Sequence, residues 1–141
     1  MEQKLIIYTD GACKGNPGIG GWGAILIYGT IIKEINGYAD ETTNNRMELT
    51  AVIESLKVIK RKCEIVIYTD SQYVQRGMTE WLDGWIKKKW KNVKNPDLWQ
   101  ELVEIAAQYS IEWRWVRGHN GDKYNERADE LANMAISEHL A

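Results

Sequence analysis

Two short segments of this chain, far apart in the sequence, are almost identical apolar runs with the same last two residues. They read Leu5-Ile-Ile-Tyr-Thr-Asp10 and Ile65-Val-Ile-Tyr-Thr-Asp70. Unbroken apolar runs of this kind are typical of strands buried on both faces. A segment with helical spacing lies between them, as the crossover between two parallel strands requires. The repeat therefore predicts an α/β fold in which both strands deliver an aspartate to the sheet edge where ligands bind.

The rest of the chain supplies further strands and helices around this pair. Apolar residues recur at helical spacing over 45–60, with Asn44 or Asn45 as the expected N-cap. Strands are expected over 4–9, 22–28, 31–38, 64–69 and 111–117, and further helices over 71–77, 81–90, 97–109 and from about 124. With 141 residues, the chain fits a single domain spanning 1–141.

Composition excludes several classes of protein. The first apolar run, from Leu5 to Tyr8, is too short for a signal peptide or a membrane span. The two cysteines, Cys13 and Cys63, form no disulfide framework, so we expect a protein of the reducing cytoplasm. We expect no contact with a membrane.

Charge is unevenly distributed along the chain. The net charge of −2 argues against an indiscriminate binder of polyanions. Five lysines nevertheless lie between Ile86 and Asn95 with no acidic residue among them. This segregation predicts a local positive field.

The paired aspartates point to a metal site. Asp10 and Asp70 would repel one another at neighbouring strand ends unless a cation lay between them. Magnesium takes oxygen ligands and keeps waters for a phosphate substrate, so the pair favours phosphoryl-transfer chemistry. Glu48, in the first turns of the helix over 45–60, is a candidate third ligand, and Asp129 in the last helix is a candidate fourth.

Structural interpretations of the same four residues stay open on spacing alone. Asp10-Gly11 is a common turn dipeptide, and Asp70 precedes a typical helix start. Glu48 stands three residues after Asn45, the spacing of a capping box. Asp129 fits a solvated helix face. The paired Thr-Asp ending of two buried strands is required by neither turn nor cap chemistry.

Five motifs, in order along the chain, carry a resemblance to a known family. They are Tyr8-Thr-Asp-Gly-Ala-Cys-Lys-Gly-Asn-Pro-Gly18, Thr42-Thr-Asn-Asn-Arg-Met-Glu-Leu49, Thr69-Asp-Ser-Gln-Tyr-Val74, Trp115-Val-Arg-Gly-His-Asn-Gly121 and Asn125-Glu-Arg-Ala-Asp-Glu-Leu-Ala132. Together they resemble bacterial type I ribonuclease H over nearly the whole chain. The resemblance implies the α/β ribonuclease H-like fold, a mixed five-stranded sheet flanked by helices on both faces.

The resemblance also implies an activity and its cofactor. Members of this family hydrolyse the RNA strand of RNA/DNA hybrids and leave 5′-phosphate and 3′-hydroxyl ends. Two Mg²⁺ ions about 4 Å apart would activate water and stabilise the leaving oxygen, with Mn²⁺ as a possible substitute. Asp10, Glu48, Asp70 and Asp129 match the family's metal-binding carboxylates. His119 matches its loop histidine, which is suited to shuttling protons or helping product to leave.

Further positions match substrate-binding residues of the family. A protein distinguishes RNA from DNA by the 2′-hydroxyl, for which amides and backbone groups are suitable partners. The positions that match at this groove are Gly11, Cys13, Asn16, Asn44, Asn45 and Gln72. Turn and cap chemistry is the alternative for Asn16 and Asn44.

Thr43 and Asn95 match positions that hold a phosphate of the DNA strand. An arginine is common in the family where this chain has Glu41, and a carboxylate there would repel the phosphate. The departure predicts a weaker phosphate pocket.

The lysine-rich segment, at about 81–95, resembles the basic protrusion of bacterial members. On one helix over 81–90, Trp81 and Trp85 would share a face and Trp90 would point the other way. We expect Trp85 and Trp90 to be mainly packing residues and Trp81 to contact substrate. Lys87, Lys88 and Lys89 are the expected phosphate contacts, with solubility alone as the alternative.

Three other functions share some of these features. A resolvase, integrase or exonuclease uses the same scaffold on another substrate. A hybrid-binding module without catalysis is a second alternative, and a fragment of a reverse transcriptase is a third. The amide groove favours a hybrid nuclease, and the four carboxylates argue against a module without catalysis. The start at Met1 and the basic protrusion favour a free-standing enzyme, which we expect to be a monomer without an obligatory protein partner.

Overall fold

The computed structural model describes residues 3–118 and 121–140. Its centre is a five-stranded sheet in the order β3-β2-β1-β4-β5. The strands are β1 (Leu5–Lys14), β2 (Gly18–Tyr28), β3 (Ile31–Thr42), β4 (Glu64–Thr69) and β5 (Ser110–Trp115). β1 pairs in parallel with β4, as the repeated string predicts, and antiparallel with β2. The sheet is therefore mixed.

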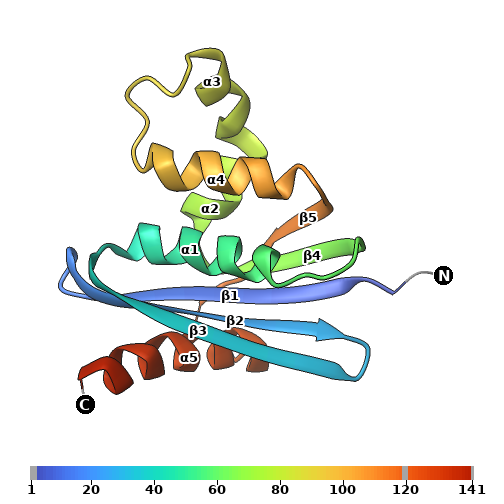
Figure 1. The fold of residues 1–141 in the computed structure, drawn as a ribbon, viewed down its shortest axis with the longest axis vertical. Coiled ribbons are helices and arrows are strands. Elements are labelled where there is room, and N and C mark those ends of the chain that lie inside the picture. Colours follow the sequence, from blue (N-terminus) through green and yellow to red (C-terminus); the bar gives the residue numbers. More distant parts are fainter. Residues whose placement is uncertain (1–2, 119–120, 141) are drawn as a thin grey trace.

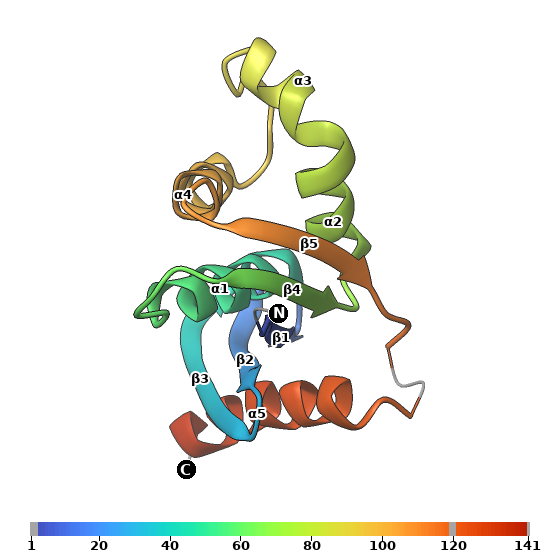
Figure 2. The ribbon, with the colours of Figure 1, turned by 90° about the vertical axis from the view of Figure 1, so that its right-hand side faces the viewer.

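Helices cover both faces of this sheet (Figures 1 and 2). They are α1 (Asn44–Lys57), α2 (Gln72–Arg76), the short π-helical η1 (Gly77–Trp81), α3 (Leu82–Lys87), α4 (Pro96–Ala106) and α5 (Lys123–Leu140). α5 lies on one face, and α1 with α4 on the other. The α/β fold class predicted from the sequence is confirmed. Among the described residues, no helix has the length and apolar character needed to cross a membrane.

The core lies mainly between the sheet and the helices α1 and α4. Ile7 and Ile67 of the repeated strands are fully buried there against Leu49 and Leu56 of α1. Cys63 packs at the margin of this cluster, as expected for a packing residue.

The strand expected over 4–9 continues past Asp10, because β1 extends to Lys14. Its parallel pairing with β4 stops at Thr9, opposite Thr69, but its antiparallel pairing with β2 continues to Lys14. Asp10 therefore lies inside the strand, opposite Gly23. The expectation was wrong because a second partner strand stabilises the backbone beyond the Asp-Gly pair.

The start of α1 also differs from the expectation. Thr43 is the N-cap, and its hydroxyl accepts a hydrogen bond from the Arg46 amide at 3.2 Å. The predicted caps, Asn44 and Asn45, are already helical residues. A threonine hydroxyl is also an established N-cap acceptor for a free N–H of the first turn, although asparagine is preferred on average.

Two glycines of β2 allow α5 to lie directly on the sheet. A Cβ atom at Gly21 would come within 2.2 Å of the Ala132 carbonyl oxygen, and one at Gly23 within 2.5 Å of the Ala128 carbonyl oxygen. No side chain fits at either position without moving α5.

The predicted helix over 81–90 is broken. α3 ends at Lys87, and Lys89 and Trp90 have positive φ angles of 53° and 64°. The chain thereby folds Trp90 back onto Trp85, with ring centroids 6.2 Å apart, so Trp90 does not point away as predicted. Trp85 and Trp90 both pack against the core, as expected.

Candidate active site

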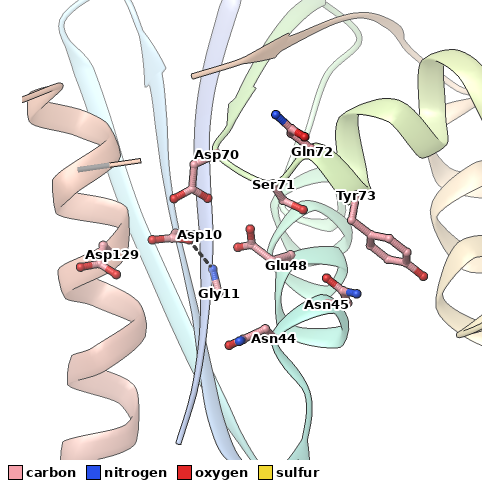
Figure 3. Close-up of a pocket in the computed structure, with 10 residues that line it drawn as sticks. All are labelled: Asp10, Gly11, Asn44, Asn45, Glu48, Asp70, Ser71, Gln72, Tyr73 and Asp129. Carbon is pink, nitrogen blue, oxygen red and sulfur yellow. Dashed lines mark hydrogen bonds between the residues drawn. The ribbon is translucent and has the colours of Figure 1, made fainter. Parts of the chain in front are cut away.

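A polar pocket opens beside the middle of β1, where α1, β4 and α5 approach the strand (Figure 3). It is lined by Asp10, Gly11, Asn44, Asn45, Glu48, Asp70, Ser71, Gln72, Tyr73 and Asp129. All four predicted carboxylates are thus brought to one cavity, together with four of the six predicted groove residues.

Three of the carboxylates converge at the floor of this pocket. Asp10, Glu48 and Asp70 each offer an oxygen within 4.8 Å of the others. They come from the middle of β1, the first turns of α1 and the bend that follows β4. Asp10 and Glu48 are only 5% and 8% exposed, so their charges are poorly solvated.

Burial, together with the closeness of the other carboxylates, disfavours the ionised forms of Asp10 and Glu48. Burial, and after it the charge of Asp70, raises the pKa of Asp10 to about 8. Burial, and after it the charge of Asp10, raises the pKa of Glu48 well above its ordinary value. One buried oxygen of Glu48, Oε1, has no hydrogen-bond partner among the described residues. An orphaned acceptor beside two further carboxylates fits a hard divalent cation.

Asp129 stands apart from this group of three. It lines the same pocket from α5 and faces it in Figure 3, but it is not among the carboxylates that lie within 4.8 Å of one another. Its Oδ1 accepts a hydrogen bond from Asn133 Nδ2 at 3.3 Å. Asp129 is half-buried where it borders the pocket.

The predicted groove residues divide into two groups. Gly11, Asn44, Asn45 and Gln72 line the pocket. Gly11 has no room for a side chain, because a Cβ there would lie 2.6 Å from the Glu48 amide nitrogen.

Cys13 and Asn16 lie further along β1 and in the turn after it, outside the pocket lining. The Asn16 side chain accepts a hydrogen bond from the Asn44 backbone N–H at 3.0 Å, the cap-like role that the sequence left open. The Cys13 thiol lies 3.4 Å from the Thr42 carbonyl oxygen.

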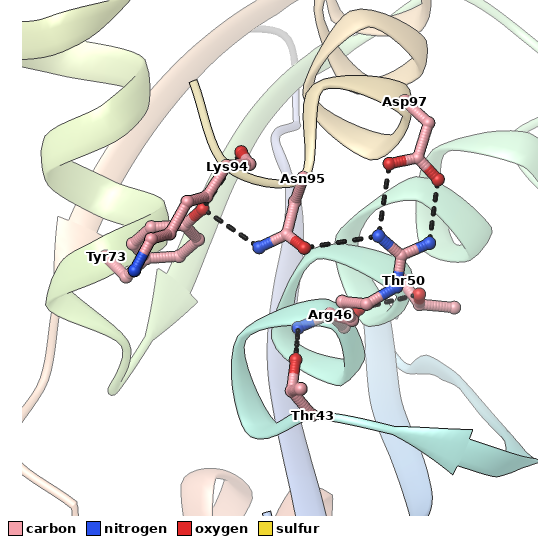
Figure 4. A network of polar contacts seen from close by, with 7 residues as sticks. All are labelled: Thr43, Arg46, Thr50, Tyr73, Lys94, Asn95 and Asp97. Carbon is pink, nitrogen blue, oxygen red and sulfur yellow. Dashed lines mark hydrogen bonds and ion pairs between the residues drawn. The ribbon is translucent and has the colours of Figure 1, made fainter. Parts of the chain in front are cut away.

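The two residues assigned to a DNA phosphate, Thr43 and Asn95, both contact Arg46 (Figure 4). The Arg46 backbone N–H donates to Thr43, and its guanidinium donates to Asn95 Oδ1 at 3.2 Å. Asn95 also contacts the hydroxyl of Tyr73, which lines the carboxylate pocket. Sequence reasoning missed Arg46 and Tyr73, although both lie inside the quoted motifs.

The end of β5 and the residues that follow it contact Thr69 and Asp70. Val116 N–H donates to the Thr69 carbonyl at 2.9 Å, and the Trp115 indole N–H donates to the Asp70 carbonyl at 3.0 Å. A Cβ atom at Gly118 would lie 2.8 Å from Asp70 Oδ2. The loop histidine assigned from the resemblance, His119, lies outside the described residues.

The lysine-rich segment lies away from the sheet, at the far end of α3 (Figure 1). Lys87, Lys88 and Lys89 are all exposed. Trp81 is half-buried and lies beside Trp85, with ring centroids 5.9 Å apart and the ring planes tilted by 48°, as its predicted shared face requires. The guanidinium of Arg76 lies over the Trp81 ring at 5.0 Å.

The chain is similar to known proteins over almost its whole length. A family model described as RNase H matches residues 2–137. A ribonuclease H of Cupriavidus pinatubonensis is 59% identical over 140 residues, covering 96% of this chain and 97% of that protein. A ribonuclease H of Francisella philomiragia is 56% identical, covering 97% of this chain and 93% of that protein.

Solved structures show the same fold. LC9-RNase H1, described as a type 1 RNase H with the type 2 active-site motif, has a TM-score of 0.89 and 33% identity, covering 98% of this chain and 74% of that one. LC11-RNase H1, crystallised in complex with an RNA/DNA hybrid, has a TM-score of 0.73 and 29% identity, covering 98% of this chain and 100% of that one.

Proposed function

The chain belongs to the ribonuclease H family, and from that membership we propose that it hydrolyses the RNA strand of RNA/DNA hybrids, leaving 5′-phosphate and 3′-hydroxyl ends. The observation that carries the proposal is the convergence of Asp10, Glu48 and Asp70 within 4.8 Å in an open polar pocket. The hybrid bound to LC11-RNase H1, a structural neighbour, supports the choice of substrate.

Asp10, Glu48, Asp70 and Asp129 would hold two Mg²⁺ ions, with Mn²⁺ as a substitute. The ions supply a water nucleophile at neutral pH and charge stabilisation for the leaving oxygen. The protein's part is to keep Asp10 and Glu48 dry and fixed by β1 and α1, so that they bind cations strongly. The Gly11 backbone N–H donates to Asp10 Oδ1 at 2.9 Å and orients that carboxylate.

The amides at the pocket would select RNA. Asn44, Asn45 and Gln72 line the pocket beside the carboxylates, where amide groups are able to donate to and accept from a 2′-hydroxyl. Gly11 lets the backbone approach the ribose. Cys13 and Asn16 would extend this groove along β1.

The remaining contacts would bind the flanks of the hybrid. Thr43 and Asn95 would hold a DNA phosphate. Trp81 and the lysines Lys87, Lys88 and Lys89 would contact the duplex through the basic protrusion. His119 would exchange protons with product or help it to leave.

We assign the enzyme to the cytoplasm as a monomer that needs no protein partner. Both cysteines are free, which fits a reducing compartment. Analytical ultracentrifugation of the purified protein tests its oligomeric state.

The test is cleavage of an end-labelled RNA/DNA hybrid beside duplex DNA and duplex RNA, in Mg²⁺, in Mn²⁺ and in EDTA. We expect cutting of the RNA strand of the hybrid alone, and none in EDTA. Binding of the hybrid without cutting in either metal would favour a binding module. Cutting of duplex DNA would assign the chain to another nuclease on the same scaffold.

A further inference from the structure

The side chain of Asn95 is held from two sides by residues of two other helices (Figure 4). Its Oδ1 accepts from Arg46 Nη1 of α1 at 3.2 Å, and its Nδ2 donates to the Tyr73 hydroxyl of α2 at 3.1 Å. Asn95 itself precedes α4 with φ 54° and ψ 43°, in the left-handed region. The two contacts distinguish the oxygen from the nitrogen, so they define one orientation of the amide.

Each of these two anchors is itself held in place. Arg46 forms a two-pronged ion pair with Asp97, with distances of 3.1 Å from Nη1 to Oδ1 and 2.7 Å from Nη2 to Oδ2. The Tyr73 hydroxyl accepts from Nε1 of the fully buried Trp99 at 2.8 Å. Asn95 is therefore connected on one side to an ion pair and on the other to the core.

The Arg46 guanidinium is occupied by Asp97 and Asn95, so it is not available to bind a phosphate directly. Its fork is shared between Asp97 and Asn95, and the Asp97 carboxylate balances its charge. The Asn95 amide nitrogen carries two hydrogens, of which Tyr73 accepts one. The other hydrogen is the group suited to a phosphate oxygen.

We propose that Arg46 and Tyr73 are positioning residues that fix the Asn95 amide for a phosphate of the DNA strand, with Asp97 holding Arg46. This rests on the proposed function, and adds to it the residues that prepare the phosphate contact. A group held in its bound orientation loses less entropy when the ligand arrives. The guanidinium of Arg46 thus compensates for the arginine that Glu41 replaces, through orientation instead of direct attraction.

Asp97→Asn tests the proposal, because orientation and simple charge predict opposite results. Removing an acidic charge near a phosphate would tighten hybrid binding if only charge mattered. We expect the reverse: a KM for the hybrid raised about fivefold, as for the loss of one ordinary hydrogen bond, with kcat unchanged. A KM equal to or below that of the control would overturn the proposal.

Glu101→Gln is the matched control. Glu101 lies on the same helix, is exposed, and pairs with Lys57 at 3.1 Å. The substitution changes the charge by the same amount without touching Asn95, so it reports the effect of charge alone.

Tyr73→Phe removes the second anchor and keeps the ring. We expect the same rise in KM, with the Tm recorded to separate it from loss of stability through Trp99. The free protein gives an independent result: the Asn95 side-chain NH₂ chemical shifts should differ from random-coil values in the wild type and move towards them in Asp97→Asn. Random-coil shifts in the wild type would refute the positioning role even if no hybrid were cut, whereas absent cleavage with displaced shifts would refute only the proposed function.

Discussion

The carboxylate of Asp10 is buried and poorly solvated. Burial and the neighbouring charge of Asp70 raise its pKa from 3.8 to about 8. The native state therefore favours a protonated Asp10, whereas the unfolded chain ionises it already in mild acid. Its contribution to stability is complete below pH 3.8 and is lost as the pH rises towards about 8.

Asp10→Asn should remove much of this pH dependence. We expect the metal-free variant to unfold with a free energy about 1–3 kcal/mol above that of the wild type at pH 8, and with little difference in mild acid. Urea unfolding in EDTA at the two pH values measures this. If the difference in unfolding free energy between the two proteins were the same at both pH values, the assigned pKa would be contradicted.

Asp70→Asn should abolish cleavage and leave the fold intact. Asp70 is half-exposed and follows β4, so an amide of the same shape fits, but an amide does not neutralise a cation. We expect the rate of hybrid cleavage to fall at least about a hundredfold, with the unfolding free energy within about 1 kcal/mol. Asp83→Asn, at an exposed acid of α3, is the control, and normal turnover of the Asp70 variant would exclude Asp70 from the site.

Asp10 and Asp70 were recognisable in the sequence because the same Tyr-Thr-Asp string ends two apolar runs, and Glu48 and Asp129 because they match motifs of a known family. Arg46 and Tyr73 were not, since their importance comes from contacts with Asn95 and Asp97, which depend on how α4 packs on α1. The placement of Asp129 at the pocket also needed the structure. The apolar stripe of the last helix does not tell which element packs beside this residue.

At the scale of elements, two expected boundaries were wrong because local signals gave way to tertiary contacts. The Asp10-Gly11 dipeptide is typical of a turn, but pairing with β2 extends β1 to Lys14. The helical spacing of 81–90 continues past Lys87, yet the chain turns so that Trp90 packs on Trp85. Burial of a large aromatic ring outweighs the weak preference of a few lysines for a helix.

The protrusion formed by α3 and the following loop allows a test of its role. Replacing Lys87, Lys88 and Lys89 with Ala should weaken hybrid binding and reduce the slope of log K against log salt by about 2, since fewer counterions are released. Anisotropy titrations of a labelled hybrid in EDTA at several salt concentrations measure the slope.

The loop between α1 and β4 provides the control for this variant. Lys60, Arg61 and Lys62 are three consecutive exposed cations outside the pocket and the protrusion. Their replacement with Ala changes the net charge equally. Equal slopes for the two triple variants would mean that the protrusion makes no special contact with the hybrid.

At the scale of the whole molecule, we expect cation binding at the three carboxylates to raise the stability of the folded chain. Three carboxylates within 4.8 Å disfavour the metal-free native state, whereas a ligand that binds only the folded chain stabilises it. We expect MnCl₂ or MgCl₂ at about a hundred times its dissociation constant to add about 2.7 kcal/mol to the unfolding free energy.

The gain should be larger at pH 8 than in mild acid, because protons compete with the metal for Asp10 and Glu48. Thermal unfolding with and without metal measures it, and KCl at equal ionic strength controls for screening. A gain that does not depend on pH would place the cation elsewhere.

The parallel pairing of β1 with β4 could be predicted because one repeated string identified both strands and the helix between them. The mixed five-stranded sheet with helices on both faces was implied by the family resemblance. The antiparallel strands followed from short apolar runs around a glycine turn. What the sequence does not encode locally is the depth at which α5 lies on the sheet, and with it the distance of Asp129 from the other carboxylates.

That depth is determined by Gly21 and Gly23, which carry no chemistry of their own. Because these residues have no side chains, the backbone of α5 packs directly on β2. A single methyl group added to this strand would displace the helix from the sheet, and Asp129 would move with it. The position of Asp129 relative to the other three carboxylates is in this way adjustable from a strand that contributes no residue to the pocket. In evolution or in engineering, the spacing of the fourth carboxylate would be open to variation while all four acids are kept.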